Sequence, residues 1–110
     1  AVRFALRHIL QREKDFVVSG DAPSGPAGLE MVAATHPDLL LLDLSMPGMN
    51  GFEVMDALAI SDWHPKVIVV SMNDEEQYVE EALQRGASGF VPKSEIPSLL
   101  VPTVRRVMAR

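Results

Sequence analysis

The sequence contains no cysteine among its 110 residues. Without thiols, the chain cannot form disulfides, bind a metal through thiolates or use a cysteine as a nucleophile. It also has no apolar run long enough to cross a bilayer, and no signal-peptide pattern. These absences predict a cytoplasmic protein that makes no contact with a membrane.

Positive charge is also scarce. There are 10 Lys and Arg residues against 15 Asp and Glu residues, which gives a net charge of −5. A surface that binds nucleic acid needs excess positive charge to meet the phosphates, so we expect no direct nucleic-acid contact from this segment. The sequence has 3 histidines, and they do not have the spacing of metal ligands.

Short apolar runs alternate with amphipathic stretches along the chain. Hydrophobic residues make up 47% of the sequence and charged residues 23%, which is the balance of one globular domain with a single core. The apolar runs predict strands at 16–19, 39–43, 66–71 and 88–91, and the amphipathic stretches predict helices at 1–12, 51–60, 73–86 and near the C-terminus. This alternation predicts an α/β fold, doubly wound around a parallel sheet.

Two stretches leave alternatives open. Prolines and glycines between Pro23 and Gly28 disfavour a helix there, although Leu29 to Ala34 could form a short one. In the last amphipathic stretch, Pro102 is compatible with a helix that begins near Ser98 or with one that kinks at the proline.

The most informative segment is Leu39-Leu40-Leu41-Leu42-Asp43-Leu44-Ser45-Met46-Pro47-Gly48-Met49-Asn50-Gly51. Its leucines predict a strand that is buried on both faces. Asp43 ends that strand, where an unpaired buried carboxylate would be costly, and ligands of open α/β sheets bind beyond the carboxyl ends of the strands. Asp43 is therefore either a functional residue at that edge or an ordinary turn residue that hydrogen-bonds its own loop.

Polar residues also follow two other predicted strands. Ser71 ends the strand at 66–71, and Lys93 comes just after the strand at 88–91. Taken singly, Ser71 would be a strand-end cap and Lys93 a solvated lysine. Because parallel strands bring their carboxyl ends to one edge, we expect both residues near Asp43, and a carboxylate, an ammonium and a hydroxyl together suit phosphoryl transfer.

Three strings carry a resemblance to a known family: the segment from Asp43 to Gly51, Ser71-Met72-Asn73-Asp74 and Gly89-Phe90-Val91-Pro92-Lys93-Ser94. They resemble the receiver domains of two-component response regulators (the CheY-like family), and most closely those of NarL/FixJ (LuxR-type) transcriptional regulators. The resemblance covers residues 1–110 as one receiver domain. It implies a CheY-like (flavodoxin-like) sheet with strand order 2-1-3-4-5 and helices on both faces.

The resemblance also implies a role for each matching residue. Asp43 would accept a phosphoryl group, Lys93 would contact the phosphoryl oxygens, and the Ser71 hydroxyl and the Phe90 ring would move together as a switch. The Asp43 carboxylate and the Ser45 backbone carbonyl would bind Mg²⁺. The residues implied to tune hydrolysis are Ser45, Met72 and Asn73.

The family's first strand, with the acid pair that binds magnesium, is absent from this sequence. It would be the central strand of the 2-1-3-4-5 order, between 16–19 and 39–43. We therefore expect the sequence to omit an N-terminal piece of about ten residues, roughly a strand and a turn. Without it, we expect a destabilised fold completed by strand exchange with a neighbour, weak or absent Mg²⁺ binding and poor phosphorylation.

The leading hypothesis is a phosphorylation switch rather than an enzyme with a separate substrate. A sensor histidine kinase would phosphorylate Asp43, and the change would bias a homodimer or a helix-turn-helix output domain in the parent protein. One alternative is a pseudo-receiver, a protein-interaction module that works without phosphorylation. Another is a flavodoxin-like or hydrolase enzyme, which would need a Gly-rich phosphate loop or a Ser/His/Asp set, and neither is visible in the sequence.

Overall fold

The computed structural model describes residues 2–44, 51–72 and 76–109. The helices are α1 (Val2–Gln11), α2 (Gly25–Thr35), α3 (Gly51–Ala59), α4 (Glu76–Gln84) and α5 (Ile96–Met108), and a short 3-10 turn lies at Lys93–Glu95. The strands are β1 (Leu39–Asp43), β2 (Lys66–Ser71) and β3 (Gly89–Pro92). None of the helices in these ranges is long and apolar enough to span a membrane.

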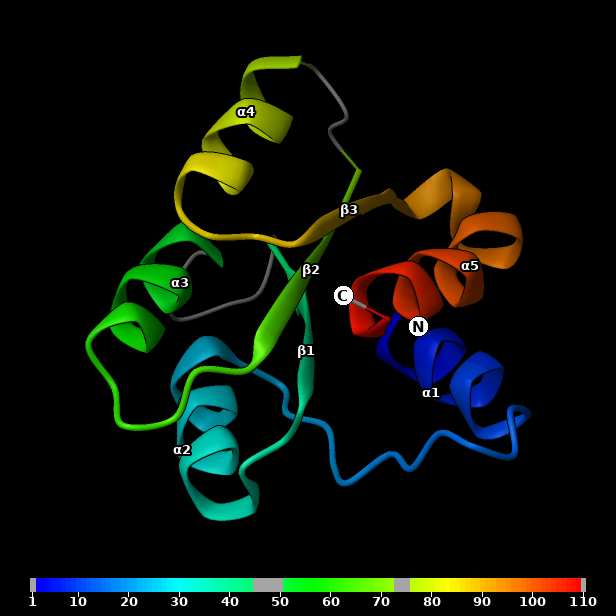
Figure 1. Cartoon of the computed structure of the whole chain (residues 1–110), viewed down its shortest axis with the longest axis horizontal. Coiled ribbons are helices and arrows are strands. Elements are labelled where there is room, and N and C mark those ends of the chain that lie inside the picture. The colour runs from blue at the N-terminus through cyan, green and yellow to red at the C-terminus, as the bar shows by residue number, and fades with distance from the viewer. Residues whose placement is uncertain (1, 45–50, 73–75, 110) are drawn as a thin grey trace.

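The three strands form one parallel sheet in the order β1-β2-β3, with β2 in the middle (Figure 1). Asp43 pairs with Val70, and Ser71 pairs with Pro92, so the carboxyl ends of all three strands reach the same edge. The predicted α/β fold with a parallel sheet is confirmed.

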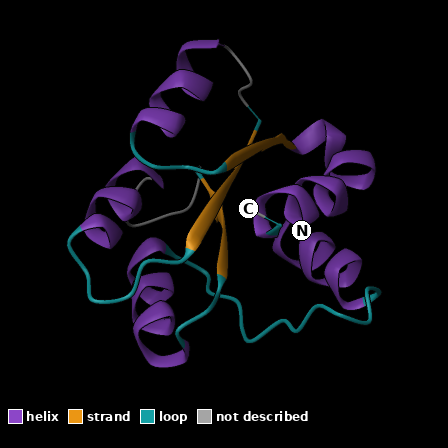
Figure 2. Cartoon of the chain, in the orientation of Figure 1, coloured by secondary structure: helices purple, strands orange, loops and turns teal. Residues whose placement is uncertain are grey.

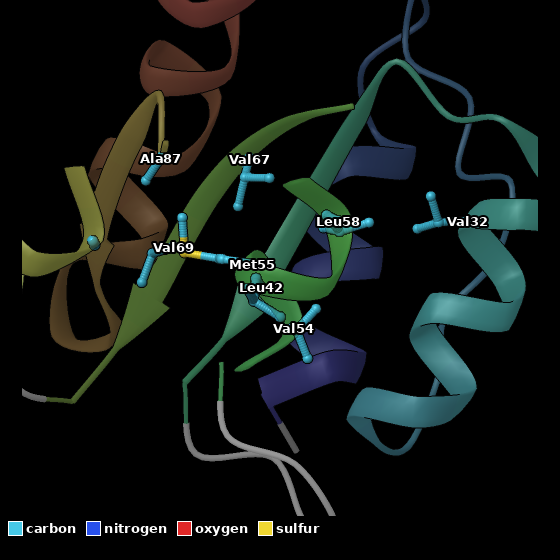
Figure 3. Close-up of a cluster of buried hydrophobic side chains, with 9 residues drawn as sticks. Val32, Leu42, Val54, Met55, Leu58, Val67, Val69 and Ala87 are labelled. Carbon is cyan, nitrogen blue, oxygen red and sulfur yellow. The ribbon is translucent and has the colours of Figure 1, made fainter. Parts of the chain in front are cut away.

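Helices cover both faces of the sheet, with α1 and α5 on one side and α2, α3 and α4 on the other (Figure 2). Each side has its own apolar core. The α2/α3 cluster (Figure 3) consists of Val32, Leu42, Val54, Met55, Leu58, Val67, Val69, Ala82 and Ala87. The α1/α5 cluster consists of Leu6, Ile68, Val70, Val91, Ile96, Leu100, Val104 and Val107.

The central strand β2 supplies side chains to both clusters. Val67 and Val69 belong to the α2/α3 cluster, whereas Ile68 and Val70 belong to the α1/α5 cluster. Successive side chains of a strand point to opposite faces, so a strand that is covered on both sides must be apolar at every position. This explains the uninterrupted run of branched residues in β2.

The other leucine-rich strand, β1, is less covered than predicted. Leu42 is buried, but Leu39, Leu40 and Leu41 are only half-buried. The strand pairs with β2 on one side and has no strand on its other side within the described residues. The prediction of full burial on both faces is therefore wrong for these three leucines, because the sequence pattern does not report whether a strand lies at an edge.

The predicted strand at 16–19 is also wrong. Residues 16–22 form a loop, and the Val17 side chain is 89% exposed. Phe16, Val17 and Val18 have the residue types of a strand, but a strand forms only where another strand accepts its hydrogen bonds. No strand lies beside residues 16–19 in the part of the chain that the structure describes, so these residues have no ladder to join.

Helix α2 begins at Gly25, earlier than the sequence suggested. Ser24 caps it, since its Oγ accepts a hydrogen bond from the Ala27 N–H at 3.3 Å. Pro26 lies in the first turn, where no intrahelical N–H is needed, so it favours the helix instead of opposing it. The capping serine and Pro26 together therefore explain why the helix begins early despite the glycines in this stretch.

Helix α5 begins at Ile96, so the first of the two alternatives, a start near Ser98, is wrong, and Pro102 lies inside the helix. Its buried side is formed by Ile96, Leu100, Thr103, Val104 and Val107. The apolar spacing of this stretch predicts Leu99 and Met108 on the core side together with Leu100, Val104 and Val107. Leu99 and Met108 are instead 37% and 39% exposed.

The inner faces of α3 and α4 differ slightly from those that the apolar spacing predicts, which are Phe52, Met55, Leu58 and Ala59 in α3 and Val79, Ala82 and Leu83 in α4. In α3, Val54 is buried and Ala59 is exposed. In α4, Ala82 is fully buried, but Leu83 is 50% exposed. Several apolar residues fit a 3.6-residue period in a short helix, so the spacing alone leaves the inner face uncertain by about one position.

Candidate functional site

The carboxyl edge of the sheet collects the polar residues that the sequence singled out. Asp43 is the last residue of β1, Ser71 is the last residue of β2, and Lys93 directly follows β3. In the register of the sheet, Asp43 pairs with Val70, and Ser71 is the next residue of β2. Ser71 in turn pairs with Pro92, and Lys93 is the residue that follows. Three successive strands thus each end in a polar residue.

An ion pair joins two of these residues directly. The Lys93 Nζ lies 3.0 Å from the Asp43 Oδ2, and the two side chains are 12% and 21% exposed. Strand β2 separates the two parent strands, so their backbones lie about 10 Å apart and only a long side chain can span that distance. Both side chains are largely shielded from solvent where they meet.

The alternation of side chains explains why these two residues meet. Leu41 and Val91 both pack against the α1/α5 cluster. Asp43 lies two positions after Leu41 on β1, so its side chain leaves the sheet on that same side, and Lys93, directly after the end of β3, reaches it there. The strand geometry thereby aims the carboxylate, and the turn after β3 brings the ammonium to it.

Ser71 and Phe90 share the opposite side of the sheet. Phe90 packs against the α2/α3 cluster and pairs with Val69 of β2. Ser71 lies two positions after Val69 on the same strand and is 3% exposed. The hydroxyl and the ring expected to move together therefore lie on one face of adjacent strands, near the edge that carries Asp43.

Of the three remaining predicted site residues, the structure describes only Met72. Met72 follows Ser71 and is 76% exposed. Ser45 and Asn73 lie outside the described residues. The roles predicted for these three residues in metal binding and hydrolysis therefore stay predictions.

The described residues of the site supply too few oxygen ligands for a magnesium ion. Asp43 brings one carboxylate, and that carboxylate already faces the Lys93 ammonium. Within residues 2–44, 51–72 and 76–109, no group of three or more His, Asp or Glu side chains could hold a metal. Mg²⁺ requires close to octahedral oxygen coordination, so these residues do not by themselves fit the ion that the resemblance implies.

Arg85 joins the two helices that flank this edge. Its Nε lies 2.8 Å from the Glu81 Oε1 in α4, and its Nη1 lies 2.5 Å from the Asp56 Oδ2 in α3. The guanidinium also lies over the Phe52 ring, 5.0 Å from its centroid. The hydrogen bond to Glu81, followed by that to Asp56, raises the pKa of Arg85 above its ordinary value. This contact between α3 and α4 was not predicted from the sequence.

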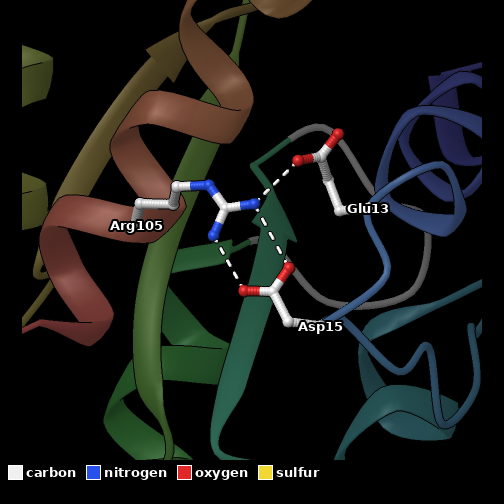
Figure 4. Close-up of polar contacts among 3 residues, drawn as sticks. All are labelled: Glu13, Asp15 and Arg105. Carbon is white, nitrogen blue, oxygen red and sulfur yellow. Dashed lines mark hydrogen bonds and ion pairs between the residues drawn. The ribbon is translucent and has the colours of Figure 1, made fainter.

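A second unpredicted cluster lies on the α1/α5 side (Figure 4). The Arg105 guanidinium lies 2.7 Å from the Glu13 Oε1 and 2.8 Å from the Asp15 Oδ2, and its centre lies 4.8 Å from the centroid of the Phe16 ring. The hydrogen bond from Arg105 lowers the pKa of Asp15, and the same contacts raise the pKa of Arg105. The partners are about ninety residues apart, so local spacing carries no signal of this cluster.

A family model, described as the response regulator receiver domain, matches residues 1–105. The chain belongs to this family. Among curated proteins, the chain is 35% identical over 108 residues to the nitrate/nitrite response regulator NarL of Escherichia coli K12. The aligned region covers 98% of this chain and 50% of that protein. It is also 35% identical over 105 residues to the transcriptional regulatory protein DegU of Brevibacillus brevis. That alignment covers 96% of this chain and 44% of DegU.

Solved structures agree with this family assignment. The signal receiver domain of NarL from Mycobacterium tuberculosis matches with a TM-score of 0.88 and 33% identity, over 99% of this chain and 89% of that one. A LuxR-family DNA-binding response regulator from Staphylococcus aureus matches with a TM-score of 0.87 and 27% identity, over 96% and 88%. The receiver fold and the likeness to NarL-type regulators are thus confirmed. The chain spans about half the length of the curated relatives it matches.

Proposed function

We propose that this receiver domain accepts a phosphoryl group on Asp43 from the phosphohistidine of a sensor histidine kinase. The observation that carries the proposal is the Asp43–Lys93 ion pair at the carboxyl edge of the sheet, where the Nζ–Oδ2 distance is 3.0 Å. A nucleophilic carboxylate and a cation for the incoming oxygens are therefore already side by side. The family match supports phosphoryl transfer as the chemistry of this edge.

In the proposed transfer, an Asp43 carboxylate oxygen forms a bond to phosphorus, and the bond between phosphorus and the donor imidazole nitrogen breaks. The imidazole nitrogen takes a proton from solvent, and Asp43 becomes an acyl phosphate. The charge at Asp43 becomes more negative, so the Lys93 ammonium exchanges a carboxylate oxygen for a phosphoryl oxygen as its partner.

The phosphoryl group would be read out through Ser71 and Phe90. Both residues lie on the α2/α3 side of adjacent strands, so a Ser71 hydroxyl drawn toward phosphoryl oxygens would leave space for the Phe90 ring to follow. This would alter the surface around β3 and the neighbouring helices, and so bias a homodimer or a helix-turn-helix output domain. The domain would act as a cytoplasmic switch, not as an enzyme with a separate substrate.

The proposal can be tested by intact mass spectrometry after incubation with acetyl phosphate, with and without Mg²⁺. We expect the chain to gain one phosphoryl group and the Asp43→Asn variant to gain none. Asp38→Asn is the matched control, because Asp38 is an exposed carboxylate at the opposite end of β1, and this variant should be modified like the parent. Modification that persists in Asp43→Asn would contradict the assignment.

The second candidate function is a pseudo-receiver that binds partners without phosphorylation. This alternative is favoured because the described residues of the edge offer only one carboxylate for a metal, and that carboxylate is already ion-paired with Lys93. A chain that remains unmodified by acetyl phosphate at every Mg²⁺ concentration, and by a histidine kinase that phosphorylates a related receiver, would establish this alternative.

A further inference from the structure

Helix α4 is held by little apolar packing. Among residues 77–84, only Ala82 is buried. An alanine side chain is a single methyl group, so its burial contributes little to the free energy of folding. Helix α3, on the same side of the sheet, buries the larger side chains Val54, Met55 and Leu58. Contacts other than the apolar core therefore determine where α4 lies.

The contact between α4 and α3 consists of charged and aromatic side chains. Tyr78 and Glu81 lie on α4, and Arg85 directly follows the helix, with its N–H donating to the Glu81 carbonyl at 3.1 Å. These three positions are spaced i, i+3 and i+7, so they share one face of the helix. Their partners on α3 are Phe52 and Asp56. These five residues form the α3/α4 contact, and none of them is buried.

Arg85 is the centre of this contact. Its guanidinium binds the Glu81 and Asp56 carboxylates at 2.8 Å and 2.5 Å, and it also lies over the Phe52 ring. The Phe52 ring stacks on Tyr78 as well, with the ring centroids 6.3 Å apart and the planes 25° apart. Arg85 and Tyr78 are about two helical turns apart, so the Phe52 ring lies between them. Loss of the Arg85 cation would therefore weaken the contact at both carboxylates and at the ring.

Solvent reaches this contact, which makes it reversible. The Asp56 side chain is 62% exposed, that of Glu81 40% and that of Arg85 33%. Exposed ion pairs and exposed cation–π contacts each stabilise a structure only modestly, because water and salt screen the charges. Separation of α3 from α4 at these five residues would expose no aliphatic side chain of the contact. The contact can therefore favour one position of α4 without preventing another.

Helix α4 connects the two residues through which phosphorylation would be read out (Figure 1). Ser71 ends β2 before the helix, and Phe90 lies in β3 after it. Phe90 packs against the α2/α3 cluster, and so does Phe52 of the α3/α4 contact. Ala82 of α4 belongs to the same cluster. A shift of Ser71 and Phe90 would therefore act on α4 both through the chain and through the core.

We propose that Arg85 is a positioning residue that holds α4 against α3, and that phosphorylation of Asp43 moves α4 by separating the α3/α4 contact. The second part rests on the proposed function, whereas the first concerns the unphosphorylated chain. Separation would uncover the Phe52 and Tyr78 rings and the Asp56 carboxylate, and so change the surface that the domain offers to a partner. A substitution that already favours the separated position leaves phosphorylation a smaller change to make.

Amide hydrogen exchange in the parent chain and in Arg85→Gln tests both parts. The readout is exchange of the α4 amides at 80–84, with the α5 amides at 103–107 as the reference for opening of the whole fold. In the unphosphorylated chain, we expect Arg85→Gln to speed exchange in α4 by about three- to tenfold relative to α5. Incubation with acetyl phosphate and Mg²⁺ should speed α4 exchange in the parent by a similar factor. It should speed α4 exchange in Arg85→Gln by less than about twofold, because the contact is already separated.

Glu80→Gln is the matched control, because Glu80 is an exposed carboxylate of α4 that makes no ion pair in the described part of the chain. It should behave like the parent in both states. Equal acceleration of α4 and α5 in Arg85→Gln, or no acceleration of α4, would overturn the role of Arg85. Full further acceleration of Arg85→Gln on phosphorylation would overturn the link to Asp43. A parent chain that gains no phosphoryl group would instead contradict the proposed function, and exchange in the unphosphorylated variants would still decide the role of Arg85.

Discussion

Ile68 lies at the centre of the molecule, fully buried on the middle strand of the sheet. Gly89 pairs with it on β3, and a Cβ atom added to Gly89 would lie 3.4 Å from the Ile68 Cγ1, 3.1 Å from the Thr103 Cγ2 and 3.3 Å from the Val107 Cγ2. The absent side chain at Gly89 therefore lets α5 approach the sheet closely. This contact fills the α1/α5 side of the core around Ile68.

Replacement of Ile68 by alanine should leave a cavity that such close packing cannot fill. We expect Ile68→Ala to lower the free energy of unfolding by about 2–5 kcal/mol. Ile60→Ala is the matched control, because Ile60 is the same residue type but is 89% exposed. Its effect should stay within about 0.5 kcal/mol. Urea denaturation followed by circular dichroism measures both, and equal effects would contradict the burial described for β2.

At the scale of single elements, the ends of the helices follow local rules. Ser24 caps the start of α2, and His36 ends that helix in a left-handed conformation with φ 48°. Gly86 follows α4 with φ +106°, a conformation that residues with a Cβ rarely adopt. Particular residues therefore determine where these helices begin and end.

The same substitution at two glycines should change stability with opposite signs. Gly86→Ala should destabilise the fold by about 1 kcal/mol or more, because the left-handed conformation becomes strained although nothing lies within 4 Å of the added Cβ. Gly28→Ala, inside α2, should stabilise it by about 0.5–1 kcal/mol, since the added Cβ meets only the Ala22 Cβ at 3.9 Å. Thermal denaturation measures both variants, and a loss of stability in Gly28→Ala would show that α2 tolerates no added methyl group.

At the scale of the whole molecule, Arg105 connects the two ends of the chain. It links α5 to Glu13 and Asp15, in the turn that follows α1. These contacts hold the start of the loop at residues 16–22. The charge cluster therefore helps to position a segment that has no strand partner in the described chain.

The cluster predicts a specific dependence of stability on pH. Arg105 lowers the pKa of Asp15 in the folded state, so the unfolded state binds the proton more readily. The stabilisation is therefore present above the ordinary aspartate pKa of about 3.9, and it is lost as the pH falls through the lower folded value. The free-energy difference between the parent chain and Arg105→Gln should be constant near neutral pH and should shrink below about pH 4.

Urea denaturation across this acidic range measures the effect, with Arg106→Gln as the matched control. Arg106 is an exposed arginine in the same turn of α5, and it has no ion pair within the described part of the chain. Its substitution should give a difference that does not follow the titration of Asp15. A pH-independent difference for Arg105→Gln would mean that its contact with the Phe16 ring, rather than its carboxylate partners, stabilises the turn.

Local patterns in the sequence were sufficient for much of this description. The apolar runs predicted β1, β2 and β3, the amphipathic spacing predicted α1, α3, α4 and α5, and the string that begins at Asp43 identified the family. These features depend on neighbours in the sequence: side-chain periodicity, turn residues and the residues at strand ends. They can be read without knowledge of which elements touch.

Tertiary structure decided the features that depend on a distant partner. Residues 16–19 have the composition of a strand but are a loop, and Leu39 to Leu41 are only half-buried, because in both cases no neighbouring strand lies alongside within the described residues. The 3.0 Å contact of Lys93 with Asp43 and the cluster around Arg105 join residues 50 or more positions apart. Backbone hydrogen bonds and ion pairs require two groups to meet in space, so a local pattern can supply each group but cannot determine whether its partner is there.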